Sequence, residues 1–188
     1  MRAVGHRVGS EAMALYRYVR NKEDLLDGLI DLVFAETDVP KTGDWKSDMR
    51  RRAISVRQAL TRHPWAVGLM ESRMQPGPAN LLHRDAVLEV LLDAGFSPVD
   101  ATHAYNTLDS YIFGFVLQER SLPFSDAEEL ADVGAELLAQ IPIDEYPHLA
   151  AVSTELLAGG FDYAAEFEFG LDLILDAINR SIARRSPS

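Results

Sequence analysis

The 188-residue chain contains no cysteine. This absence excludes disulfides, thiolate nucleophiles, iron–sulfur clusters and every zinc site that needs sulfur ligands. Long apolar runs are missing as well, because no stretch approaches the roughly 20 residues that span a bilayer. The N-terminal sequence MRAVGHRVGS also lacks the apolar centre of a secretion signal. Together these absences predict a cytosolic protein.

The composition is that of a folded globular protein. Hydrophobic residues make up 47% of the chain and charged residues 25%, which is too apolar for a disordered protein. A chain of this length buries about two-thirds of its unfolded surface, so a stable core can form without covalent cross-links. We expect one domain with a smaller one attached.

Charge is distributed unevenly although the net charge is −11. Residues 1–22 contain five Lys or Arg against Glu11, whereas residues 64–188 contain six Arg against twenty acids. A net charge this negative argues against a protein that binds nucleic acid over its whole surface. A basic N-terminal segment on an acidic body is what a localised DNA-contacting element needs, but from charge alone a simple solvated face is the favoured interpretation.

Apolar residues recur at intervals of three and four throughout, which is the period of the α-helix, and no strand alternation is visible. The pattern predicts an all-α fold. Asn21 and Ser97 are expected to cap helices at their N-terminal ends, and Gly95 to end one. We expect helices over residues 1–8, 12–19, 22–36, 46–63, 81–94, 98–119, 126–138, 146–157 and 163–183.

The first 33 residues combine a short helix, a turn at Gly9, a second short helix and a third helix capped by Asn21. This is the order of a helix-turn-helix, whose second helix enters the major groove of DNA. Leu15 and Val19 can face inward. Outward hydroxyl and guanidinium groups can then meet phosphates or base edges. The side chains expected on that outward side are Tyr16, Arg17 and Tyr18.

The stretch VGHRVGSEAMALYRYVRNKEDLLDGLIDLVF resembles the tetracycline-repressor (TetR) family of bacterial transcription regulators. Its strongest matches are Gly9, Leu15-Tyr16, Val19, Asn21-Lys22 and Leu25-Leu26. The remainder of the chain resembles the family's C-terminal domain. The matching segments are RHPW at 62–65, DAGFS at 93–97, GFVLQE at 114–119 and FEFGLDLILDAI at 167–178. The resemblance implies an all-helical homodimer that represses transcription, binds a palindromic operator and releases it when a small molecule binds.

By this resemblance, residues 1–36 form a helix-turn-helix domain, residues 37–45 a linker, and residues 46–188 a helical ligand-binding and dimerisation domain. Carried over by position, Arg2 reads a base, and Arg17 meets a base or a phosphate. The residues expected against bases or thymine methyl groups are Ala12, Met13 and Ala14. Those expected on phosphates are Tyr16, Tyr18 and Lys22. For Tyr16 and Tyr18, simple helix packing remains the alternative.

The family usually begins with a further helix before the position that is Met1 here. Two interpretations stay open: Met1 is an internal methionine of a longer natural protein, or the chain is short. In a short chain, Leu25, Leu29 and Val33 lack a packing partner, at about 25 cal/mol for each Å² of apolar surface left uncovered. We therefore expect the 188-residue chain to have a weakened N-terminal domain and to bind DNA poorly.

The long helices near 98–119 and 161–183 imply a four-helix dimer interface, in which Gly114 and Gly170 permit close approach. The alternative is that both helices are ordinary monomer core. A ligand cavity is expected between the helices from 46 to 119, lined by apolar and polar side chains together. Its candidate residues are Trp65, Leu69, Met70, Met74, Leu82, Val90, His103, Asn106, Thr107, Ser110 and Phe113.

The tetracycline repressor itself uses a histidine of its long pocket helix to help hold a magnesium–drug chelate, and Ser110 occupies that place here. Met70 and Ala86 stand at two other positions where that protein contacts the drug through polar groups. Tetracycline is therefore not the expected effector. The effector's identity and the operator sequence stay open, and no cofactor or metal is expected.

Two other classes of function are alternatives to a regulator. An enzyme is disfavoured because the sequence contains no H-E-x-x-H motif, no glycine-rich phosphate loop and no nucleophile elbow. The second alternative is a dimeric small-molecule-binding module whose DNA binding is lost or impaired.

Overall fold

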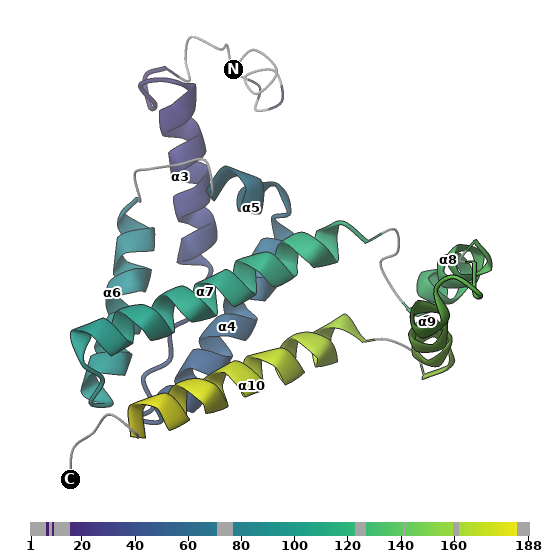
Figure 1. The fold of residues 1–188 in the computed structure, drawn as a ribbon. Coiled ribbons are helices and arrows are strands. Elements are labelled where there is room, and N and C mark those ends of the chain that lie inside the picture. The colour runs from purple at the N-terminus through teal and green to yellow at the C-terminus, as the bar shows by residue number, and fades with distance from the viewer. Residues whose placement is uncertain are drawn as a thin grey trace.

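The computed structural model describes residues 7, 9, 16–70, 77–122, 127–140, 142–159 and 162–183. Within these ranges the chain is helical and contains no strand, as the apolar period predicts (Figure 1). None of the helices in this part combines the length and apolar character needed to cross a membrane. The helices are α3 (Lys22–Ala35), α4 (Trp45–Arg62), α5 (Trp65–Met70), α6 (Pro78–Asp93), α7 (Pro98–Arg120), α8 (Ala127–Ala139), α9 (Pro147–Gly159) and α10 (Tyr163–Ala183).

The body of the molecule is built on α4, α7 and α10, which pack against one another. Figure 1 shows α7 and α10 running side by side across α4, while α3 and α6 lie next to each other at one end. Helices α8 and α9 pack on each other at the far end of α7 and α10. The end of α3 that follows the N-terminal segment therefore points away from the body.

Apolar stripes on the central helices form the core. On α7 the buried stripe is Ala101, Ala104, Leu108, Ile112 and Val116, and on α10 it is Phe167, Leu171 and Leu175. Val33 is 3% exposed and belongs to the same core, so this part of α3 is covered by the body itself. The buried faces of α7 and α10 thus follow the three- and four-residue apolar period that the sequence shows.

Helix ends follow the predicted caps. The Asn21 side chain accepts a hydrogen bond from the backbone N–H of Asp24 (2.8 Å), and Ser97 accepts one from that of Asp100 (3.1 Å). Gly95 ends α6 in the left-handed region with φ +88°, a conformation that side chains with a Cβ disfavour. Gly9 likewise has φ +66° and lies in a turn, as its position in the sequence predicts.

Two local predictions are wrong. Residues 16–18 form a turn and residue 19 has no regular structure, so the helix expected over 12–19 does not reach Val19. The reason is that the Asn21 cap needs an extended backbone, φ −159°, directly before α3. In addition, α5 follows Pro64 where no helix is expected from the sequence. Residues 11–15 and most of the helix expected over 1–8 lie outside the described residues.

The two glycines expected at a dimer interface lie in different surroundings. A Cβ built on Gly170 would come within 2.3 Å of the Tyr111 hydroxyl oxygen of the same chain. That hydroxyl donates a hydrogen bond to the Phe167 carbonyl (2.9 Å), and the Tyr111 ring stacks on the Phe167 ring. Gly170 therefore serves the packing of α7 on α10 within one chain. A Cβ on Gly114 would meet nothing within 4 Å.

Candidate functional site

The segment just before α3 presents aromatic and cationic side chains to solvent. Tyr18 is 87% exposed and Tyr16 is 43% exposed. Arg17 and Lys22 are exposed as well, whereas Val19 is half-buried. This matches the expected inward place of Val19 and the outward places of the tyrosines. Arg2, Ala12, Met13 and Ala14 lie outside the described residues.

A reciprocal cap fixes the direction in which this segment leaves α3. Asn21 accepts from the backbone N–H of Asp24, while the Asp24 carboxylate accepts from the backbone N–H of Arg20 (2.8 Å) and from its guanidinium Nη2 (2.8 Å). The hydrogen bond from Arg20 lowers the pKa of Asp24, so the carboxylate stays charged. Such a cap satisfies free backbone donors at a helix start and orders the entering chain.

The body holds α3 through its contact with α6. The Asp31 carboxylate on α3 accepts a hydrogen bond from the backbone N–H of Asn80 (3.0 Å), in the first turn of α6. A carboxylate at a helix N-terminus is favoured by the free N–H groups and the helix dipole. Gly77 leaves the necessary space, since a Cβ there would lie 2.4 Å from Asp31 Oδ1. A residue of α3 thus caps another helix.

A buried polar cluster lies where α4, α6 and α7 meet. Arg52 of α4 is 1% exposed and donates from Nε to His83 Nε2 (3.0 Å) and from Nη2 to Asp109 Oδ1 (2.6 Å). Its third nitrogen, Nη1, is buried without a hydrogen-bond partner in the described part of the chain. Buried donors are rarely left unpaired, so this atom calls for an explanation.

The cluster continues to the C-terminal end of α3. Because Arg52 Nε can only donate, His83 Nε2 accepts and the histidine proton lies on Nδ1. Nδ1 then donates to Thr37 Oγ1 (2.8 Å), and that hydroxyl donates to the Phe34 carbonyl (2.6 Å). Burial, and secondly the charge of Arg52, lowers the His83 pKa to about 4. The histidine is therefore neutral at pH 7.

Tyr105 forms an aromatic wall of this cluster. The guanidinium carbons of Arg52 and Arg84 lie 5.5 and 4.9 Å from the centre of its ring. Burial raises the pKa of the Tyr105 hydroxyl, and the charge of Asp109 acts in the same direction. The hydroxyl is thus protonated at every pH at which the protein would work. The Phe34 ring lies on another side, 5.6 Å from the His83 ring.

The predicted ligand-lining residues that the structure describes differ in their exposure to solvent. Val90 is buried, and Leu69, Met70 and Phe113 are half-buried. Leu82 is 70% and Trp65 42% exposed. The four polar candidates of α7 are exposed: His103, Asn106, Thr107 and Ser110. Met74 lies outside the described residues.

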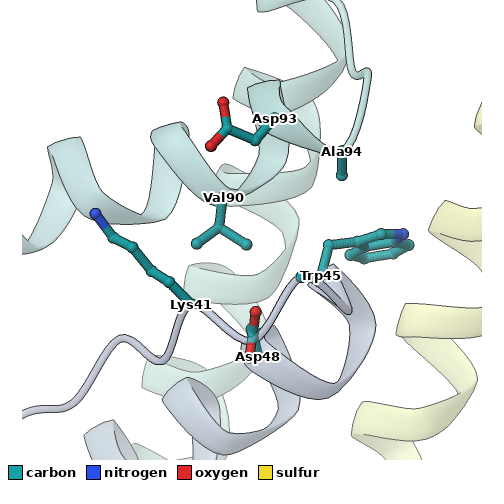
Figure 2. Close-up of a pocket in the computed structure, with 7 residues that line it drawn as sticks. Lys41, Trp45, Asp48, Val90, Asp93 and Ala94 are labelled. Carbon is teal, nitrogen blue, oxygen red and sulfur yellow. The ribbon is translucent and has the colours of Figure 1, made fainter.

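A pocket of about 210 Å³ opens between the start of α4 and the end of α6. Figure 2 shows Trp45 and Asp48 facing Val90 and Ala94 across it, with Lys41 and Asp93 at its sides. Gly43 completes the lining, and Val90 is the residue shared with the predicted set. Asp48 is already held by the backbone N–H and hydroxyl of Thr42, at 2.9 and 2.8 Å. A volume this small is below the usual size of a drug-sized ligand site.

Sequence reasoning missed Arg52, His83 and Asp109 as site residues. A signal was present, because Arg52 lies three residues after Met49 and four before Val56, both of them buried on the same helical face. An arginine within an apolar stripe must find partners, since buried charge without partners is strongly unfavourable. In the described part of the chain, no three His, Asp or Glu side chains are grouped as a metal site would need.

Comparisons with known proteins agree with this architecture. Residues 39–182 match the family described as Tetracyclin repressor-like, C-terminal domain. The tetracycline repressor protein class A from transposon 1721 of Escherichia coli is 34% identical over 181 residues, which are 94% of this chain and 79% of that protein. The HTH-type transcriptional repressor DrrR1 of Streptomyces coeruleorubidus is 29% identical over 98% of this chain and 71% of its own length.

Among solved structures, the Streptomyces coelicolor TetR family protein ActR in complex with actinorhodin superposes with a TM-score of 0.77, covering 96% of this chain and 87% of that one. At 22% sequence identity this likeness concerns the fold. The family match and the 34% identical relative go further, because each extends over most of the chain. The chain belongs to the tetracycline-repressor family of transcriptional regulators.

Proposed function

We propose that the chain is a ligand-responsive repressor that acts in the cytoplasm, binds operator DNA as a homodimer and releases it when a small molecule binds. In this proposal residues 1–36 form the DNA-binding domain, residues 37–45 the linker, and residues 46–188 the ligand-binding and dimerisation domain. The observation that carries it is the exposed group of tyrosines and cations ahead of the capped helix α3.

Three features support contact with DNA by this group. Tyr16, Tyr18 and Lys22 are exposed and supply hydroxyl and ammonium donors of the kind that hold phosphates. The cap formed by Asn21, Arg20 and Asp24 orders the segment before DNA arrives, which reduces the entropy lost on binding. The match to named transcriptional repressors extends through this segment.

A homodimer is supported by an apolar face of α10 that is exposed in the described part of the chain. Phe169 and Leu173 are four residues apart on one side of the helix and are 63% and 55% exposed. Exposed apolar patches of this kind are typical of interaction surfaces. Helix α9 also leaves Leu149, Val152 and Leu156 exposed. A symmetric pair of α10 helices would cover the first of these patches.

Response to a ligand is supported by the hydrogen-bonded connection between the body and α3. From Asp109 it passes through Arg52 and His83 to Thr37, whose hydroxyl binds the last turn of α3. A molecule that displaced Arg52 would change the partners of His83 and the hold on α3. The Asp31 cap of α6 gives a second connection between the same two helices.

An electrophoretic shift with the DNA upstream of the chain's own gene tests the proposal. Because weak binding is expected of this chain, the titration extends to high protein concentration, at which the wild type is expected to shift this fragment and not an unrelated one of equal length. The double variant Tyr16→Phe, Lys22→Gln is expected to bind at least about tenfold more weakly, since each lost phosphate donor removes a charge-assisted or neutral hydrogen bond. A matched control is Arg51→Gln, which removes an exposed cation on α4.

The possible outcomes separate the functions. Equal shifts of both DNA fragments by the wild type, or equal binding by the double variant and the control, would contradict DNA recognition through this segment. A dimer in sedimentation that shifts no DNA would instead favour the module without DNA binding. A monomer would contradict the proposed assembly.

A further inference from the structure

The buried guanidinium of Arg52 has one nitrogen, Nη1, without a partner in the described part of the chain. Nε and Nη2 are occupied by His83 and Asp109. A guanidinium carries five N–H donors and no acceptor. Leaving a buried charged donor unpaired is unfavourable by an amount comparable to a lost hydrogen bond. An acceptor oxygen supplied from outside the chain would remove that penalty.

The local charge favours an acceptor that is negatively charged. Two guanidinium groups, those of Arg52 and Arg84, lie over the Tyr105 ring, and Asp109 is the carboxylate to which Arg52 is hydrogen-bonded. His83 adds no compensating negative charge, because it accepts from Arg52 as a neutral ring. A carboxylate is the complement that pairs best with an arginine.

One aromatic ring lies against the Arg52 guanidinium, and a second lies against its partner His83. The Tyr105 ring lies against both guanidinium groups, and Phe34 contacts the His83 ring. Met70 and Phe113 are half-buried against the neighbouring core. Flat apolar surfaces of this kind bind the body of an aromatic ligand, while one or two polar groups fix its orientation.

We propose that the effector is an aromatic carboxylate whose oxygen accepts a hydrogen bond from Arg52 Nη1 beside the Tyr105 ring. This inference rests on the proposed function and specifies the chemical class of its ligand. Arg52 is 1% exposed, so the ligand reaches it by parting the side chains above it. Sites of this kind are minor conformations that a ligand makes dominant. The new carboxylate competes with Asp109 for the same guanidinium.

Isothermal calorimetry on the DNA-free chain tests this inference. The probes are benzoate, salicylate and 1-naphthoate, each paired with its neutral primary amide. At least one acid is expected to bind about tenfold or more tightly than its amide, as a charge-assisted hydrogen bond requires. The Asp109→Asn variant removes the competing carboxylate and is expected to bind the acid at least about threefold more tightly.

Variants on α4 complete the test. Arg52→Gln is expected to lose at least about tenfold in affinity for the acid and to leave the amide unchanged. The matched control Arg51→Gln removes an exposed cation from the next position and is expected to bind like the wild type. Should Arg52→Gln fail to fold, the opposite response of Asp109→Asn still decides, because a purely structural cluster predicts no gain in acid affinity.

Several outcomes would overturn the inference: no acid binding more tightly than its amide, an Asp109→Asn affinity equal to that of the wild type, or an Arg52→Gln variant that binds the acid normally. In those cases a water molecule alone occupies the Nη1 position. Since the measurement needs no DNA, its failure leaves the electrophoretic result untouched. Loss of DNA binding would in turn leave the calorimetric result standing.

Discussion

Two groups of cations in this protein lie in opposite surroundings. Around Tyr16–Lys22 the cations Arg17 and Lys22 are exposed, whereas Arg52 is held inside the helical body. Exposed cations keep their water and lose little when a phosphate replaces it. A buried guanidinium has lost its water and depends on every partner it has. The first group is therefore suited to reversible DNA contact, and the second to sensing which acceptors surround it.

The two groups are connected through helices α3 and α6. His83 and Thr37 carry the hydrogen bonds from Arg52 to the last turn of α3, and Asp31 of α3 caps α6. At the same end of α3, Glu36 accepts from His63 Nε2 (2.8 Å) and Arg62 Nη2 (3.0 Å) of the α4 end. A change around Arg52 thus acts on a helix whose other end orients the exposed segment.

The largest effect is expected from breaking the buried ion pair. Arg52→Met leaves the Asp109 carboxylate and His83 Nε2 without their donor, and we expect a loss of about 3–5 kcal/mol in the free energy of unfolding. Urea unfolding followed by circular dichroism measures it. The double variant Arg52→Met, Asp109→Leu removes both charges and is expected to recover most of the loss. Additive losses in the double variant would contradict a coupled pair.

A smaller effect is expected from protonating His83. Its pKa is about 4 in the folded chain against 6.5 for the free side chain, so the unfolded state binds more protons between these values. Stability is therefore full above about pH 6.5 and is lost as the pH falls toward 4. Between pH 7 and pH 5, protonation of His83 is expected to lower the free energy of unfolding by about 2 kcal/mol. In urea unfolding of His83→Gln, the difference between the free energies of unfolding at pH 7 and pH 5 is expected to be smaller by this amount than in the wild type. The exposed His148→Gln control should match the wild type.

The glycines of α7 and α10 should respond in opposite directions. Gly170→Ala pushes a methyl group against Tyr111 and is expected to lower the free energy of unfolding by about 1–2 kcal/mol. Gly114→Ala meets open space within the chain and is expected to raise it by up to about 1 kcal/mol through helix propensity. Thermal unfolding at a protein concentration that keeps the oligomeric state fixed compares them. Equal shifts for both variants would contradict the packing described for Gly170.

Helix positions were predictable where local chemistry decides them. The caps at Asn21 and Ser97 and the glycine after α6 each depend on a few neighbouring residues, and all three are confirmed. Helix α5 was missed because its six residues are too few for an apolar period to show. The helix expected through Val19 was wrong, because residues 16–18 form a turn and Asn21 has an extended backbone as the cap of the following helix.

The buried cluster was beyond the sequence because it depends on pairs far apart in the chain. Arg52 meets Asp109 across 57 positions and His83 across 31. The position of Arg52 within an apolar stripe indicates a buried charge, but it does not identify the partners of that charge. The four polar candidates on α7 stay predictions: His103, Asn106, Thr107 and Ser110.

Salt dependence of operator binding tests the central claim most directly, namely that the segment before α3 holds DNA phosphates. In a titration of upstream DNA from 50 to 200 mM salt, Lys22→Gln removes one phosphate contact from each subunit of the proposed dimer. It is expected to reduce the slope of log affinity against log salt by about 1.8, with almost no change in stability. The equally charged control Arg51→Gln, on α4, is expected to keep the wild-type slope. A Lys22→Gln slope equal to the wild type, or the same reduction in both variants, would contradict the account.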